Sequence, residues 1–245
     1  MIPSRYPSDG SSAESFAGYL NWIFRANNRL TLNGGLRVTG SKISARWNDT
    51  AQVDKLLSTL DLQTEALTYT LAITYRPNQK WQINSLISSG FRNPNIDDIG
   101  KIRESNGILL MPNSFLKPEY AYTIELGIKR TSPNKINFID LRPFITLVSR
   151  HIVRSDFIVF TDTTTTDEKT IIYNGEEVIT QANKNLGNRF IYGGSIQGNW
   201  LLIKPFEITG GITFTTADRN EDYGPMPSIA PLFGTFTTVS YTHLT

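Results

Sequence analysis

The chain has 245 residues and a formal net charge of +2, with 39% hydrophobic and 19% charged residues, which is enough for one sizeable folded unit. So small a net charge gives no electrostatic support for a nucleic-acid partner. The sequence contains no cysteine and only two histidines, His151 and His243, which excludes disulfides and thiol nucleophiles and argues against a histidine metal site.

Neither a secretory signal nor a transmembrane helix is visible in the sequence. The first residues lack a basic segment followed by an apolar core. No apolar run approaches the roughly 18 residues that a membrane-spanning helix needs. If the protein works in a membrane, we therefore expect it to cross the membrane as β-strands, with its export signal outside this sequence.

Alternation of apolar and polar residues with a period of two dominates the chain and predicts one strand after another. In chain order, the sequence predicts about ten strands, which cover residues 14–24, 29–40, 65–75, 80–90, 119–129, 144–154, 170–181, 189–202, 207–216 and 234–241. Only residues 53–60 place apolar residues at helical spacing, which predicts a turn or two of helix inside a loop.

In these strands the apolar residues share one face and the polar residues share the other. We expect an apolar convex face that meets lipid and a polar concave face that lines a watery lumen. The apolar set contains Leu32, Leu36, Leu71, Ile73, Ile124, Leu126, Ile212 and Phe214, and the polar set contains Thr31, Arg37, Thr70, Glu125, Lys129 and Thr213. Alternation alone leaves a second interpretation open, a soluble β-sandwich with a buried apolar core and long ligand-binding loops.

The connections between the predicted strands alternate between short and long. Short, turn-rich segments cover residues 25–28, 76–79, 132–135 and 203–206, and long excursions cover residues 41–64, 91–118, 153–188 and 217–232. In an antiparallel up-and-down meander, this alternation puts every tight turn at one end of the sheet and every long loop at the other. Outer-membrane barrels have short periplasmic turns and long extracellular loops, so the pattern favours an all-β, partial transmembrane barrel over the sandwich.

Two segments carry a more specific pattern. Residues 90–101 read GFRNPNIDDIGK, and residues 112–129 read PNSFLKPEYAYTIELGIK. Together they resemble the barrel of TonB-dependent outer-membrane receptors, especially those of Bacteroidetes. In that family a Gly-Phe-Arg-x-Pro strand end is followed by a loop, an Asn-x-x-Leu-Lys-Pro-Glu segment and a strand bearing Glu-x-Gly. The matching positions here are Gly90, Phe91, Arg92, Pro94, Asn113, Leu116, Lys117, Pro118, Glu119, Glu125 and Gly127.

The resemblance implies that residues 1–245 are an internal portion of a receptor barrel, without the plug domain and the terminal strands. A full barrel of this type has roughly 22 strands around a plugged lumen. By resemblance, the receptor lies in the outer membrane of a Gram-negative bacterium, contacts outer-membrane lipid and has its plug domain and TonB as partners. It takes up a scarce ligand, for which an iron chelate, haem, cobalamin, a glycan and a peptide all remain open.

The sequence offers no support for catalysis, since it contains no cofactor motif and no cluster of catalytic side chains. We therefore expect a protein without a cofactor that is not an enzyme. Three charged residues, Arg37, Glu125 and Lys129, share the predicted lumen face. Two arrangements are open for them, a charge ladder that packs against the plug or, without a plug, contact with water alone, and in both we expect them to belong to the wall rather than to contact the substrate.

Four polar residues of one predicted outer loop are candidate ligand contacts: Arg92, Asn93, Asp97 and Asp98. They follow directly on the strand end, where a long loop would face the outside. The alternative interpretation is structural, with Arg92 pairing with loop carboxylates and the two aspartates facing water.

Overall fold

The computed structural model describes residues 7–47, 59–158, 170–173, 175–203, 206–220, 224–226 and 228–240. Strands account for most of these residues, and the one helix among them is α1 (Ile96–Ile99). No helix in the described part of the chain is long and apolar enough to span a membrane.

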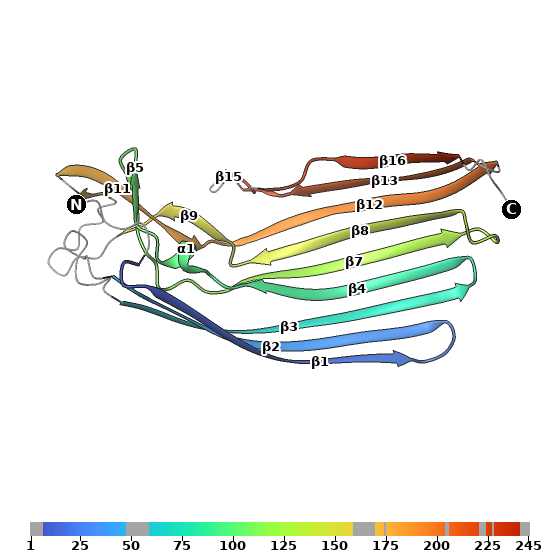
Figure 1. Ribbon diagram of the computed structural model, residues 1–245, viewed down its shortest axis with the longest axis horizontal. Helices are drawn as coiled ribbons and strands as arrows, with labels where there is room; N and C mark the ends of the chain where they lie inside the picture. The colour runs from blue at the N-terminus through green and yellow to red at the C-terminus, as the bar shows by residue number, and fades with distance from the viewer. Residues whose placement is uncertain are drawn as a thin grey trace.

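Nine strands form one continuous antiparallel sheet (Figure 1). Neighbours in the sheet follow one another along the chain apart from the loop excursions, so the sheet is an up-and-down meander. β3 has 20 residues and β12 has 16, both longer than the roughly 9–11 residues of a tilted transmembrane strand. In sheet order the strands are β1 (Ser11–Arg25), β2 (Leu30–Arg46), β3 (Thr59–Asn78), β4 (Trp81–Arg92), β7 (Glu119–Thr131), β8 (Phe138–Ser149), β12 (Asn188–Ile203), β13 (Phe206–Ala217) and β16 (Phe233–Ser240).

The tight and long connections lie at opposite ends of this sheet, as the sequence predicts. The pairs β1–β2, β3–β4, β7–β8 and β12–β13 are joined at one end, on the right in Figure 1. The excursions from β4 to β7, from β8 to β12 and from β13 to β16 leave from the other end. We call these two ends the turn end and the loop end.

Asparagine side chains close the tight turns. The Asn27 side chain accepts hydrogen bonds from the backbone N–H groups of Arg29 (2.8 Å) and Leu30 (2.9 Å). Asn78 does the same for Lys80 (2.9 Å) and Trp81 (3.2 Å). A short amide side chain that satisfies backbone donors two or three residues further on is the reason asparagine favours turns.

A smaller sheet is built from the long excursions and lies with α1 at the loop end (Figure 1). β11 is its central strand and pairs with β9 and β10 in antiparallel and with β6 in parallel. Its strands are β5 (Arg103–Ser105), β6 (Ile108–Leu110), β9 (Ile152–Asp156), β10 (Thr170–Tyr173) and β11 (Glu176–Asn185). A separate two-stranded pair, β14 (Arg219–Asn220) and β15 (Gly224–Pro225), follows β13.

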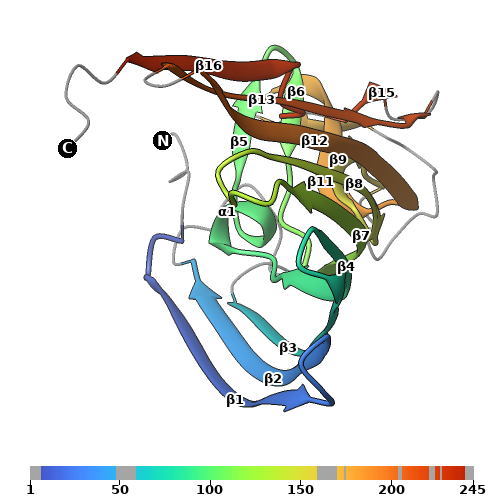
Figure 2. The same cartoon turned by 90° about the vertical axis from the view of Figure 1, so that its right-hand side faces the viewer.

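The main sheet is strongly curved and open. Viewed from the turn end, it runs as an arc from β1 to β16, with α1, β5 and β6 over its hollow (Figure 2). Among the described residues, β1 pairs only with β2 and β16 only with β13. The predicted open, curved meander is therefore confirmed.

The two faces differ in chemistry as the alternation predicts. Rows of residues paired across the strands are apolar and polar in turn: Leu71, Ile87, Ile124 and Ile145 form one row, and Thr70, Ser88, Thr123 and Thr146 form the next. The loop residue Asn93 donates a hydrogen bond to Ser41, on the same face as Arg37. Because the loops cover the hollow of the arc, the polar face is concave. The predicted placement of both residue sets is confirmed.

The buried core lies under the loops rather than behind the apolar face. Ile124 and Ile212 on the convex face are 54% and 55% exposed, whereas a sandwich would bury them. The buried apolar cluster instead joins the loop ends of β2 and β3 to α1 and the smaller sheet: its largest members include Ile43, Trp47, Leu60, Leu62, Ile99, Leu109, Met111, Leu116, Ile152 and Val178. The barrel-wall interpretation therefore fits better than the sandwich.

Some predicted elements differ in the structure. The main sheet contains nine of the about ten predicted strands, because residues 170–181 form the β10–β11 hairpin of the smaller sheet. The predicted strand 144–154 is interrupted at Arg150, whose φ of 57° separates β8 from β9. Residues 53–58 of the predicted helix lie outside the described residues, and Thr59 and Leu60 belong to β3. α1 was not predicted, since four residues carry no helical periodicity.

Aromatic residues border the exposed apolar face. On β7 this face runs from Tyr120, whose ring stacks on Tyr122 with centroids 5.9 Å apart, to Arg130, which pairs with Trp81. From residue 120 to residue 130 the strand rises about 33 Å, or about 25 Å along the membrane normal at a tilt of about 40°. This matches the apolar band of outer-membrane barrels.

Charge on the convex face should oppose folding into lipid. We expect Leu71→Arg to destabilise the bilayer-folded protein by about 2–4 kcal/mol, because Leu71 lies within the apolar band. The control is Thr70→Arg, one residue away on the concave face, which should change stability by less than about 1 kcal/mol. Urea titrations in lipid vesicles measure both values, and equal losses would contradict the assignment of the faces.

Candidate functional site

The segments with the receptor-like pattern meet where β4 and β7 enter the loops. Arg92, the last residue of β4, pairs in the sheet with Glu119, the first residue of β7. The Arg92 guanidinium lies 3.9 Å from the Glu119 carboxylate and 2.8 Å from that of Asp98 in α1. The arginine therefore ties two strand ends to the short helix between them.

α1 is held at its start by a reciprocal cap. The Asn95 side chain accepts a hydrogen bond from the Asp98 N–H (2.9 Å), and the Asp98 carboxylate accepts one from the Asn95 N–H (3.0 Å). This capping box satisfies backbone donors that would otherwise be unpaired at a helix start. The same Asp98 carboxylate binds Arg92, so the cap also orients the helix on the wall.

Glu119 joins a second loop to this cluster. Its carboxylate lies 2.9 Å from Nδ1 of His151 and accepts a hydrogen bond from the Ile152 N–H at 2.8 Å. Burial raises the pKa of Glu119, but the hydrogen bonds from His151 and Ile152 and the charges of His151 and Arg92 outweigh burial. The net pKa is below the usual value. Glu119 lies beyond the apolar band, at the loop end of β7.

The side chains of three asparagines form hydrogen bonds with backbone groups that are far away in the sequence, and so connect the loops to one another. Asn113 donates to the Asn183 carbonyl (2.7 Å), and Asn183 donates to the Asp98 carbonyl (3.0 Å). Asn185 exchanges hydrogen bonds with the backbone of Lys117, accepting from its N–H (2.8 Å) and donating to its carbonyl (2.9 Å). These contacts fix β11 to the segment before β7. We call Arg92, Asp98, Glu119, His151 and these three asparagines the anchor cluster.

The apolar residues of the pattern supply the packing beneath the anchor cluster. Pro94 and Leu116 are fully buried, and Leu116 belongs to the apolar core. Pro118 is buried as well. Gly127 on β7 faces Asn84, where an added Cβ would lie 3.3 Å from the asparagine side chain, so the glycine gives this side chain room.

The structure places the four candidate ligand contacts close together but in different environments. Arg92 and Asp98 pair with each other, and Asn93 donates to Ser41 at 3.0 Å on the concave face. The Asp97 carboxylate is 53% exposed and lies 3.5 Å from Lys101. Their role in ligand binding stays a prediction.

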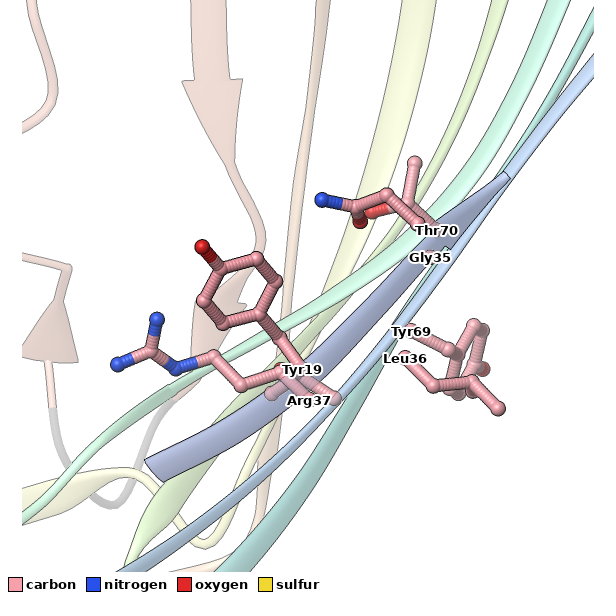
Figure 3. Close-up of a pocket in the computed structure, with 8 residues that line it drawn as sticks. Tyr19, Gly35, Leu36, Arg37, Tyr69 and Thr70 are labelled. Carbon is pink, nitrogen blue, oxygen red and sulfur yellow. The ribbon is translucent and has the colours of Figure 1, made fainter. Parts of the chain in front are cut away.

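A polar hollow of about 330 Å³ lies on the concave face of β1–β3 (Figure 3). The side chains of Tyr19, Arg37 and Thr70 project into the concave side, whereas Leu36 and Tyr69 point to the opposite face. Arg37 donates a hydrogen bond to Thr39 at 3.2 Å and makes no ion pair with a described residue. The hollow can receive a polar or anionic group from the lumen.

The predicted ladder of Arg37, Glu125 and Lys129 does not form. Glu125 lies 3.8 Å from Arg142, which also binds the buried Asp140 at 3.0 Å. Lys129 lies over the Phe138 ring, 4.1 Å from its centroid. Arg37 is separated from Glu125 by β3 and β4. The ladder fails because two strands separate Arg37 from Glu125 and Lys129, and because Glu125 and Lys129 each find a partner on the neighbouring strand β8.

Sequence reasoning missed part of the anchor cluster. His151, Asn183 and Asn185 belong to the cluster only because the excursion between β8 and β12 packs against Glu119, α1 and the segment before β7. The one available signal was the asparagine-rich stretch ANKNLGN at residues 182–188. Within the described residues, no group of three or more His, Cys, Asp or Glu side chains is placed to hold a metal ion.

Residues 1–245 match the protein family described as TonB dependent receptor-like, beta-barrel. Solved structures with a similar fold include the copper transporter OprC (14% identity, TM-score 0.67) and the siderophore receptor PiuA from Acinetobacter baumannii (17%, 0.65). A third is a double mutant of the Serratia marcescens hemophore receptor HasR in complex with its hemophore HasA and heme (17%, 0.65).

These structures are much longer than the chain. The match covers 95% of this chain and 34% of OprC, 93% of this chain and 31% of PiuA, and 89% of this chain and 36% of HasR. The chain thus spans about a third of their length, and at these identities the likeness concerns the fold alone. No curated protein sequence matches the chain.

Removing the charge of Glu119 should loosen the loops without unfolding the wall. We expect Glu119→Gln to raise hydrogen exchange of residues 113–119 and 151–153 by about tenfold or more, because a charge-assisted hydrogen bond is worth about 1.5–3 kcal/mol. The neutral amide still accepts from Ile152 but no longer attracts Arg92. Glu177→Gln, an exposed glutamate of β11, is the matched control.

The contribution of the Glu119 carboxylate to the stability of the loops should be lost at low pH. Since the folded pKa of Glu119 is lowered, its contribution is complete above the usual value of 4.5 and is lost as the pH falls through the lowered pKa. Hydrogen exchange of the loops, corrected for the intrinsic rate, should rise on acidification in the wild type but not further in Glu119→Gln. An equal pH response in both proteins would contradict this role.

Proposed function

Because the chain belongs to the TonB-dependent receptor family through its β-barrel domain, we propose that it forms part of the wall and the outer loops of a receptor that takes up a scarce ligand. The observation that carries the proposal is the pairing of an exposed apolar convex face with a polar concave face in one antiparallel meander. A barrel wall needs both faces at once, because lipid lies on one side and a watery lumen on the other.

We place the chain in the outer membrane of a Gram-negative bacterium, with the turn end in the periplasm and the loop end outside. The family consists of outer-membrane receptors, and such barrels have short periplasmic turns. The open edges of β1 and β16 and the span of about a third of the related structures support a partial barrel within residues 1–245. Further strands of the same receptor would pair with these edges.

The partners of the proposed receptor are outer-membrane lipid, a plug domain and TonB. The polar concave face, with Arg37, Glu125 and Arg142, is the surface that a plug would contact. The names of related structures mention copper, a hemophore with heme and siderophores, which supports a scarce nutrient as the ligand class. Because the relatives are receptors and transporters, we propose transport without catalysis.

Within the four candidate ligand contacts, Asp97 is the one most available to a ligand. Arg92 and Asp98 hold the anchor cluster, and Asn93 is bound to Ser41. Asp97 is 53% exposed at the rim of the loops and is balanced only by Lys101 among the described residues. We therefore propose Asp97 as the direct contact and the other three as the residues that position it.

The proposed orientation predicts which residues can be labelled from outside. The chain contains no cysteine, so single cysteines report on their own positions. In intact cells, a membrane-impermeant maleimide should label Ser114→Cys, in the exposed loop, and should not label Gln79→Cys, in the β3–β4 turn. Both should react after the outer membrane is opened. Labelling of Gln79→Cys alone in intact cells would reverse the orientation.

The ligand role of Asp97 can be separated from a structural role. We expect Asp97→Asn to weaken binding of the transported ligand by about fivefold or more, since a charged hydrogen bond is lost, while thermal stability stays within about 0.5 kcal/mol. Binding is measured on the receptor with ferric siderophores and haem as probes. Lys101→Gln, which removes the other charge of the pair, is the control, and unchanged binding in Asp97→Asn would refute the contact.

A further inference from the structure

An apolar hollow of about 390 Å³ interrupts the convex face near the turn end of β12, β13 and β16. Its floor is made by glycines, and its sides by large apolar residues: Ile196, Trp200, Ile212 and Phe236. None of the residues that line it carries a charge. A smooth barrel wall presents projecting side chains to lipid, so this hollow is a local departure from the wall.

Glycine creates the hollow and sets the position of Trp200. A Cβ on Gly198 would lie 2.3 Å from the end of the Trp200 ring, so only glycine lets the indole lie back along its own strand. Gly210, paired with Gly198 in the sheet, leaves the adjoining floor open. A Cβ on Gly210 would meet only ordinary contacts, 3.4 Å from the Thr235 carbonyl and 3.6 Å from the Phe236 ring. A Cβ on Gly210 would therefore fit without displacing its neighbours.

A second hollow of about 280 Å³ adjoins the first at the turn end, and Trp200 lines both. Its lining includes two cations, Lys80 and Arg130, and no carboxylate. Neither cation forms an ion pair with any residue that the structure describes, and Arg130 lies 5.5 Å from the Trp81 ring centroid. A single row of cross-strand pairs links the two hollows: Trp81, Arg130, Ile139, Gly198, Gly210 and Phe236.

We propose that these joined hollows bind one anionic phospholipid of the periplasmic leaflet, with its phosphate at Lys80 and Arg130 and an acyl chain over Gly198 and Gly210. The inference rests on the proposed membrane orientation, which puts the turn end in the periplasmic half of the bilayer. Basic side chains beside an apolar groove at membrane depth recognise anionic headgroups. Charge complementarity selects an anionic lipid over a neutral one.

The geometry disfavours the other occupants of such a surface. A protein segment would bring backbone polar groups against glycines whose own backbone is part of the sheet, where only Gln197, Trp200 and Thr235 among the lining residues carry hydrogen-bonding side chains, and unpaired groups are costly in hydrocarbon. An acyl chain carries no such groups. The two cations lie at the turn end only, where a headgroup would sit at the membrane surface, with the hollow running from there towards the middle of the membrane.

The test uses the receptor that carries this chain, reconstituted in nanodiscs with equal amounts of phosphatidylglycerol and phosphatidylcholine. Native mass spectrometry then gives the ratio of the two lipids retained by the protein. We expect preferential retention of phosphatidylglycerol, and about a tenfold lower preference at this site in the double variant Lys80→Gln/Arg130→Gln. Arg29→Gln, which removes a cation from the β1–β2 turn at the same end, is the matched control and should leave the ratio unchanged.

The hollow itself is tested by Gly210→Leu, whose side chain enters it without a backbone clash. This variant should retain one lipid fewer, whichever headgroup is offered. An unchanged ratio in the double variant, or an equal change in Arg29→Gln, would overturn the proposal. A receptor that does not insert into bilayers would instead refute the membrane placement, whereas an inserted receptor without lipid preference refutes only the lipid site.

Discussion

Backbone hydrogen bonding across the strands is the constraint on which the rest of this structure depends. A wall that crosses an apolar layer has no water to satisfy its N–H and C=O groups, so each must bond to a neighbouring strand. β2 and β3 accordingly pair without a register shift from Leu30–Tyr75 to Arg46–Thr59. The two register shifts that the structure records in the main sheet, after Tyr75 and after Leu201, both lie at the turn end, where water reaches the backbone.

Once the register is fixed, a period of two assigns every side chain to lipid or to the lumen. This explains why the wall could be predicted from the sequence. The alternation of apolar and polar residues around Leu71 and Thr70 is enough to assign each of them to a face of the sheet. The smaller sheet could not be predicted in that way. Residues 170–181 alternate like a wall strand, but β11 pairs in parallel with β6, about 70 residues earlier, through Ile179 and Ile108. Local periodicity carries no information on which sheet a strand joins.

The site was predictable only in part, for the same reason. The family pattern located Arg92 and Glu119, and the carboxylates that follow Arg92 in the loop made an ion pair there one of its two predicted roles. The partners that complete the anchor cluster, His151 and Asn185, come from other loops and have no local signature. Glu125 likewise forms an ion pair with Arg142, on the next strand, rather than with Arg37. In each case the sequence identified one residue of an interacting pair, whereas the identity of its partner depends on tertiary structure.

Asparagine side chains bind backbone groups at both ends of the wall, but over different sequence separations. This difference suits a receptor. At the turn end, Asn27 and Asn78 satisfy donors two or three residues away, so each hairpin is closed independently of the others. At the loop end, Asn183 and Asn185 bind backbone carbonyls 85 and 68 residues away, which joins the loops to one another. Since Arg92 and Glu119 bind those same loops to the ends of β4 and β7, the wall gives the outer surface a fixed base. Binding residues on loops are most precise when a rigid scaffold positions them, and here long-range amide contacts connect the scaffold to the loops.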